Sequence, residues 1–226
     1  PAADAHAYLA RTRRRPLVHL DELGCLGPHV LVAHAVHVDD DEIDVLLERQ
    51  VAVASCPWAY LRLGQGVSQA GRHAELVERG GRVALGCDSE NAGDAIDVLR
   101  AATLTAGLAK DMRLDPEHFG ARRAFGLATW AGAEAIGMAH EIGSLEPGKR
   151  ADLVLVDTSG PEWVPLADDS IRQLVWASDG RSVRHVVASG RVVVRDGEPT
   201  LIDREALASE ADAARQRLLS DAGLAR

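Results

Sequence analysis

RVALGCD, residues 82–88, is a short apolar run that ends in an aspartate, and two earlier runs in the chain have a similar form. HVLVAHAVH at residues 29–37 contains His34, and VAVASC at residues 51–56 ends in Cys56. Apolar, β-branched runs of this length predict strands of a parallel sheet when helical stretches separate them. Because the carboxyl ends of such strands line the active site of a parallel α/β barrel, we expect His34, Cys56 and Asp88 to share one edge.

The stretches between these runs have helical patterns. Residues 39–42 are acidic and open a helix whose apolar residues share one face. Another helix stops at Gly80-Gly81, and Asp115-Pro116-Glu117 predicts the start of a third, with proline at its first position. The alternation of strands and helices indicates an α/β fold for this part of the chain.

Beyond about residue 140 the pattern changes to strands joined by tight turns. Ser189-Gly190 has the form of a two-residue hairpin turn between two valine-rich strands, and residues 203–219 have the pattern of a capped amphipathic helix. We therefore place a domain boundary near residue 140.

The composition excludes several classes of protein. The chain has 226 residues, 46% of them hydrophobic, and a formal charge of -9, which argues against binding to nucleic acid. No apolar run reaches the ~18 to 20 residues that a membrane span needs, and the first residues lack the apolar region of a signal peptide, so we expect a cytoplasmic location. The chain has 3 cysteines in no paired motif, which argues against disulfides and cysteine-based zinc sites.

The candidate residues each have an ordinary structural alternative. Asp88 follows Ala84 and Gly86 on one face of its run, which leaves space for a ligand, but an aspartate there can also be a turn residue. His34 can be a core histidine, and Cys56 is better explained as a small buried residue than as a nucleophile. Two other patterns are rejected as metal motifs, namely the H-x-x-E at residues 19–22 and the H-x-E at residues 73–75.

Several motifs together resemble one family. They are RPLVHLDELG at 15–24, VAHAVH at 32–37, Cys56-Pro57, ALGCDS at 84–89 and IGSLEPGKRADL at 142–153. In this order they resemble the amidohydrolase superfamily, in particular its aminohydrolases, the group with cytosine, guanine and S-adenosylhomocysteine deaminases and triazine hydrolases. The resemblance runs from about residue 15 to residue 200.

The resemblance implies a fold and a division of the chain. It implies an α/β protein that comprises the C-terminal part of a (β/α)8 TIM-type barrel, strands six to eight, followed by a small β-sandwich domain and a C-terminal helix. In these terms residues 1–140 belong to the barrel, 141–202 to the C-terminal part of the sandwich and 203–226 to the helix. A whole barrel of this type takes about 250 residues, so we expect the remaining strands to precede this sequence.

The resemblance also implies site residues. His34 would contact a metal-bound hydroxide and the substrate, and Asp88 would be a metal ligand that takes the proton of the attacking water. The metal would be one divalent ion, zinc or iron, although the H-x-H pair and the H-x-x-E motif that supply the family's other ligands are not found at strand ends here. Trp58 would stack on a planar ring or anchor a packed loop, and Glu90 and Asn91 would reach the substrate.

The function implied is a metal-dependent hydrolase that deaminates a small aromatic heterocycle, through attack of the metal-bound hydroxide on a ring carbon. Two alternatives stay open: a non-catalytic barrel relative that acts as a binding or assembly subunit, and a cyclic amide hydrolase. By analogy with the family we expect a homo-oligomer with a small-molecule substrate and neither nucleic acid nor membrane as a partner.

Overall fold

The computed structural model describes residues 2–93 and 95–224, so residue 94 and the terminal residues 1, 225 and 226 of the predicted domains lie outside the described part. The chain forms two compact units, one of Pro1–Lys149 with Thr158–Gly180 and one of Arg150–Asp157 with Arg181–Arg226. This division differs from the single boundary predicted near residue 140, because the segment 158–180 returns to the first unit. Its Val175 is fully buried, and the Val175 carbonyl accepts a hydrogen bond from Thr103 Oγ1 at 2.5 Å.

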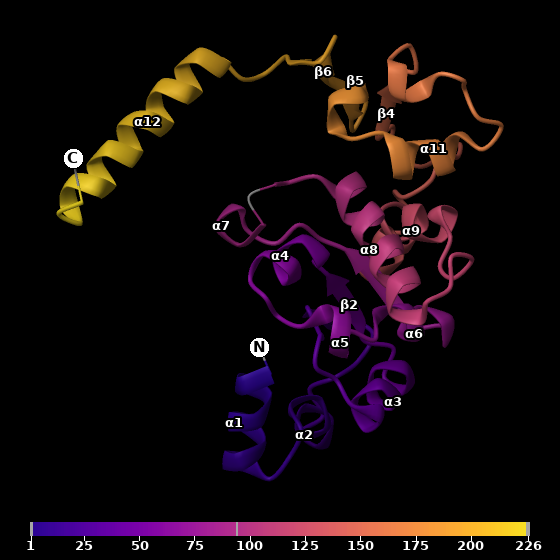
Figure 1. Cartoon of the computed structure of the whole chain (residues 1–226), viewed down its shortest axis with the longest axis vertical. Helices are drawn as coiled ribbons and strands as arrows, with labels where there is room; N and C mark the ends of the chain where they lie inside the picture. Colours follow the sequence, from indigo (N-terminus) through magenta and orange to yellow (C-terminus); the bar gives the residue numbers. More distant parts are fainter. Residues whose placement is uncertain (1, 94, 225–226) are drawn as a thin grey trace. The chain divides into compact units, whose positions relative to one another are not determined.

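The first unit contains a three-stranded parallel sheet whose strands alternate with helices, as the sequence predicts (Figure 1). The strand order is β1-β2-β3, and Ala52 of β2 pairs with both Leu31 and Arg82. Its elements are α1 (Ala2–Thr12), α2 (Pro16–Glu22), β1 (Leu31–Ala33), α3 (Asp40–Glu48), β2 (Ala52–Ser55), α4 (Pro57–Arg62), α5 (Val67–Ala70), α6 (His73–Glu78), β3 (Arg82–Leu85), α7 (Glu90–Gly93), α8 (Val98–Arg113), α9 (Ala121–Leu127), α10 (Trp130–Ala135), the 3-10 turn η1 (Pro161–Trp163) and α11 (Ser170–Ala177).

The two faces of this sheet differ in side-chain size. Val53 and Val83 are almost fully buried in the main core, which also contains Ile43 of α3 and Ala106 of α8. On the other face the side chains are small, and Ala52 and Ala84 pack against Ala135 of α10. The alternation along β3 therefore places Ala84 on the face away from the main core.

The strands are shorter than the apolar runs that predict them. β1 ends at Ala33 and β3 at Leu85, so His34 and Asp88 lie in the loops that follow. Both residues have left-handed backbone conformations, with φ of 72° at His34 and 62° at Asp88. The chain turns sharply at these positions, which ends the extended conformation.

The local signals for helix starts have different outcomes. At Asp39 a capping box forms, because the Asp39 side chain accepts from the Glu42 N–H and the Glu42 side chain accepts from the Asp39 N–H, so the predicted start of α3 is confirmed. The start predicted at residues 115–117 is wrong. There Asp115 Oδ1 accepts from the Glu117 N–H at 2.9 Å within a turn, and the next helix begins at Ala121.

The second unit contains a four-stranded antiparallel sheet in the order β4-β5-β6-β7. Ser189 and Gly190 join two of its strands with φ of 48° and 76°, which is the two-residue hairpin turn that the sequence predicts. The β-sandwich stays a prediction, since the described residues of this unit form one sheet. Its elements are β4 (Leu153–Val156), β5 (Val183–Ala188), β6 (Arg191–Arg195), β7 (Glu198–Pro199) and α12 (Arg204–Asp221), with the 3-10 turn η2 (Gly180–Ser182) at the junction.

Among the helices of the described residues, none combines the length and the apolar character that crossing a membrane requires.

Candidate active site

His34 and Asp88 lie side by side beyond the carboxyl ends of β1 and β3. Their closest atoms, His34 Nε2 and Asp88 Oδ2, are 3.9 Å apart. This distance is too long for a hydrogen bond, so the two side chains are not hydrogen-bonded to each other through these atoms. The side chains are 39% and 24% exposed, which leaves both within reach of a small molecule.

The Asp88 carboxylate is oriented by its own backbone turn. Asp88 Oδ1 accepts a hydrogen bond from the Ser89 N–H at 2.7 Å, while Oδ2 is the oxygen nearest to His34. Aspartate tolerates the left-handed backbone of this turn better than most residues that have a Cβ. The turn reading of Asp88 is therefore correct, and it is compatible with a chemical role because one oxygen remains available.

The backbone of His34 is held from two sides. Its N–H donates to the Ala54 carbonyl at 2.9 Å, and its carbonyl accepts from His73 Nε2 at 2.6 Å and from the Tyr60 hydroxyl at 3.3 Å. The imidazole itself packs edge-on against the Tyr60 ring, with 5.6 Å between ring centroids. His34 Nδ1 is buried without a hydrogen-bond partner among the described residues, so the ring is not committed to a protein acceptor.

Tyr60 and His73 form a buried pair beneath His34. Their rings are stacked, with 5.7 Å between centroids and 16° between planes. The Tyr60 hydroxyl also accepts from the Cys56 N–H at 2.7 Å. Burial raises the pKa of Tyr60 and lowers the pKa of His73, so both rings are neutral at ordinary pH. No local pattern in the sequence predicts that either residue lies at the site.

Cys56 is buried between the two strand ends. Burial, followed by the nearby charge of Asp88, raises the pKa of its thiol to about 11. The thiol is therefore protonated at neutral pH and is a poor nucleophile. This confirms the interpretation of Cys56 as a small buried residue.

The three residues expected to contact substrate lie in the short helices α4 and α7, which follow β2 and β3. Trp58 is in α4, and the Arg100 guanidinium lies over its ring at 4.3 Å from the centroid. Glu90 and Asn91 are exposed in α7, where Asn91 Oδ1 accepts from Ser89 Oγ at 2.5 Å. The contacts of Trp58 favour the anchoring alternative, and substrate binding by these three residues stays a prediction.

The described residues contain no group of three or more His, Cys, Asp or Glu side chains that could hold a metal ion. His34 and Asp88 supply one nitrogen and one oxygen donor, and a structural or catalytic zinc takes at least three protein ligands. The imidazole of His34 and Asp88 Oδ2 are suited to be two of the ligands of such a site, because the imidazole lacks a partner for Nδ1 and the hydrogen bond from the Ser89 N–H goes to Oδ1. His19 of the rejected H-x-x-E pattern is engaged elsewhere, because its Nδ1 is 2.8 Å from the Tyr8 hydroxyl.

Residues 4–193 of this chain match the sequence model of the amidohydrolase family. The chain belongs to the amidohydrolase family. Similar proteins include a 5-methylthioadenosine/S-adenosylhomocysteine deaminase of Syntrophobacter fumaroxidans, 38% identical over 86% of this chain and 43% of that protein. A 5'-deoxyadenosine deaminase of Methanothermobacter thermautotrophicus is 35% identical over 90% of this chain and 46% of that protein. The chain thus spans about half the length of these amidohydrolases.

Solved amidohydrolase structures are similar over nearly the whole chain. An adenosine deaminase from Xanthomonas campestris with bound zinc has a TM-score of 0.90 and 30% identity, over 97% of this chain and 49% of that one. An atrazine chlorohydrolase from Arthrobacter aurescens, complexed with zinc, has a TM-score of 0.83 and 26% identity over 93% of this chain and 46% of that one. These similarities support the α/β fold that the sequence predicts.

Proposed function

We propose that the protein carrying this chain hydrolytically removes the amino group from the adenine ring of a nucleoside, with a divalent metal, zinc or iron, as its cofactor. The observation that carries the proposal is the approach of His34 Nε2 and Asp88 Oδ2 to 3.9 Å at the carboxyl edge of the sheet. The names of the similar proteins, which act on methylthioadenosine, S-adenosylhomocysteine and deoxyadenosine, support an adenine nucleoside within the broader class of aromatic heterocycles.

Asp88 acts as the proton carrier in this proposal. Its Oδ1 is fixed by the Ser89 N–H, so Oδ2 is the oxygen that receives a proton from the attacking water. The water oxygen forms a bond to the ring carbon that bears the amino group, and the π electrons of the adjacent carbon-nitrogen double bond move onto the ring nitrogen until the amino group leaves. Asp88 then returns the proton to the amino nitrogen, the carbon-nitrogen bond breaks, and ammonia leaves.

His34 orients the oxygen of the attacking water and of the tetrahedral adduct. Its Nε2 lies 3.9 Å from Asp88 Oδ2, whereas Nδ1 is buried, so Nε2 is the ring nitrogen that forms a hydrogen bond with that oxygen, and a preorganised partner of this kind lowers the barrier. The hydrogen bonds from His73 and Tyr60 to the His34 carbonyl keep the imidazole in place while the charge develops.

Asp88 is the residue of this chain that would hold the metal, with His34 beside it. When bound, a divalent metal lowers the pKa of water toward neutrality. We also propose that Trp58, Glu90 and Asn91 border the substrate, because they lie in the short helices that follow strands β2 and β3 of the same sheet.

The test uses the full-length protein, purified with zinc or iron and assayed for ammonia release. The substrates are methylthioadenosine, S-adenosylhomocysteine, deoxyadenosine and adenosine, with guanine and atrazine for comparison. We expect ammonia from at least one adenine nucleoside. No ammonia from any substrate with the metal-loaded protein would favour the non-catalytic alternative.

Asp88→Asn tests the role of the carboxylate, because asparagine also tolerates the left-handed backbone. We expect kcat/KM to fall by about 10² to 10⁴, the range for loss of a general acid-base group, with an unchanged melting temperature. Asp196→Asn is the matched control, since Asp196 has a similar φ of 54° in a tight turn of the second unit. Near-normal turnover by Asp88→Asn would contradict the proposal.

A further inference from the structure

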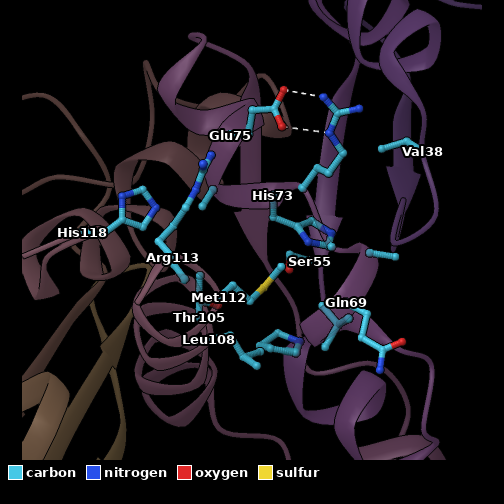
Figure 2. A pocket seen from close by; sticks show the side chains of 17 residues that line it. Val38, Ser55, Gln69, His73, Glu75, Thr105, Leu108, Met112, Arg113 and His118 are labelled. Carbon is cyan, nitrogen blue, oxygen red and sulfur yellow. Dashed lines mark hydrogen bonds and ion pairs between the residues drawn. The ribbon is translucent and has the colours of Figure 1, made fainter. Parts of the chain in front are cut away.

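A cavity of about 460 Å³ is lined by residues of α5, α6 and α8 (Figure 2). It reaches the carboxyl end of β2, because Ser55 and Pro57 are among its lining residues, as is His73, which donates to the His34 carbonyl. His34, Asp88, Trp58, Glu90 and Asn91 are not among its lining residues. Its volume is within the usual range for small-molecule sites.

One wall presents a hydroxyl that has no partner. Thr105 of α8 is 7% exposed, and its Oγ1 is buried without a hydrogen bond among the described residues. A helical threonine usually donates to the carbonyl four residues earlier. Thr103 of the same helix does so to the Leu99 carbonyl at 3.2 Å, whereas Thr105 does not. A buried hydroxyl left unpaired is costly, and it gains most from a ligand that can pair with it.

The rim carries one cation that the protein does not neutralise. The Arg72 guanidinium forms ion pairs with Glu75 Oε1 and with Asp40 Oδ1, each at 2.6 Å. The side chain of Arg113, the last residue of α8, lines the cavity and makes no hydrogen bond or ion pair with the described residues. In Figure 2 its side chain reaches between Glu75 and His118.

The remaining walls are largely apolar. Val67 of α5 and the α8 side chains Leu108 and Met112 line the cavity below the charged rim. His118 adds a second buried atom without a partner among the described residues, its Nε2, while its Nδ1 lies 3.4 Å from Glu78 Oε1. The cavity thus combines an apolar body, two unpaired polar atoms and a single free guanidinium.

We propose that this cavity binds a small molecule with an apolar body and one carboxylate group. Arg113 pairs with the carboxylate, since a guanidinium matches its geometry through two parallel hydrogen bonds. Thr105 donates to the ligand deeper in the cavity, and Leu108 and Met112 pack on its apolar part. A monoanion suits the site better than a dianion such as phosphate, because only one cation is free and Glu75 lies beside it.

Phenylacetate is the probe for this site, with phenylacetamide as the uncharged probe of the same shape. Calorimetry on the full-length protein should give a Kd for phenylacetate of about 1 mM, the range for a ligand of this size. Phenylacetamide should bind at least about tenfold more weakly, because it lacks the charge that pairs with Arg113.

Four variants, two of them controls, locate the binding site. Arg113→Gln should weaken phenylacetate binding at least about tenfold, and Thr105→Val, which keeps the side-chain shape, should weaken it about threefold. The control Arg217→Gln, at an exposed arginine of α12, should bind normally. Asp88→Asn should also bind normally, which separates this cavity from the candidate active site. The proposal is wrong if the wild type does not bind phenylacetate, or if Arg113→Gln and Thr105→Val both bind it with unchanged affinity.

Discussion

Replacement of Tyr60 by phenylalanine should destabilise the protein although it removes a single oxygen. The Tyr60 ring is 1% exposed, and phenylalanine would fill the same space. Without the hydroxyl, the buried Cys56 N–H loses the acceptor at 2.7 Å, and the His34 carbonyl loses one of its two side-chain donors.

The cost follows mainly from the Cys56 N–H. A buried donor left without an acceptor costs about 1 to 3 kcal/mol, whereas the His34 carbonyl keeps its hydrogen bond from His73. We therefore expect a loss of about 2 kcal/mol in the free energy of unfolding, which lowers the melting temperature by roughly 4 °C or more in a domain of this size.

Tyr8→Phe is the matched control, because the Tyr8 hydroxyl makes one hydrogen bond to His19 at 2.8 Å in a partly exposed position. Its loss should cost about 0.5 kcal/mol, the lower end for a hydrogen bond that water can replace. Both variants are measured by urea denaturation, followed by circular dichroism, and by thermal melts. If Tyr60→Phe is no less stable than Tyr8→Phe, the hydroxyl does not hold the Cys56 and His34 loops as the geometry implies.

Two further predictions concern protonation. Burial holds the pKa of His73 below its ordinary 6.5, so the unfolded chain takes up a proton below about pH 6.5 that the folded protein does not. The free energy of unfolding should therefore fall as the pH drops from about 6.5 toward the pKa of His73 in the folded protein. His73→Gln keeps a donor for the His34 carbonyl, and its melting temperature should fall less steeply with pH. Equal slopes for the variant and the wild type would contradict this assignment. The pKa of Cys56 near 11 predicts that iodoacetamide at about pH 8 labels the exposed Cys25 well before Cys56, as peptide mass spectrometry would detect, and rapid labelling of Cys56 in the folded protein would be the opposite result.

The chemical pair at the site could be predicted because its signal is local. His34 and Asp88 each follow the end of an apolar run, and parallel strands bring such ends to one edge of a sheet. The alternation of Ala84 and Gly86 before Asp88 also indicated a face with space above it. These inferences need only the order of residues within a strand.

The side chains that hydrogen-bond to the His34 carbonyl could not be predicted in the same way. His73 and Tyr60 reach the His34 carbonyl across 39 and 26 positions of sequence, and no periodic pattern links them. Trp58 and Tyr60 lie two positions apart after Cys56-Pro57, and this aromatic pair is the sequence signal that is compatible with a packed loop. The left-handed backbone of His34 was not predicted because it is most readily recognised at glycine.

Helix starts show a similar limit of local chemistry. Asp97 and Asp115 both have side chains that accept from a backbone N–H a few residues later. The first bond begins the long helix α8, and the second closes a turn that leads to the buried Phe119. The difference lies in the packing of the following residues, so the aspartate alone cannot distinguish the two outcomes.

The left-handed backbone at His34 and Asp88 limits how this scaffold can be redesigned. A valine, isoleucine or threonine at either position would strain the main chain, since branched side chains are strongly disfavoured at such φ angles. A loss of activity in such a variant would then report the strain and not the missing chemical group. A saturation library at these positions would therefore return mostly asparagine, aspartate, histidine and glycine among folded variants. Under the proposed function, efforts to change the substrate should vary Trp58, Glu90 and Asn91 instead, because those positions lie in helices with ordinary backbone angles.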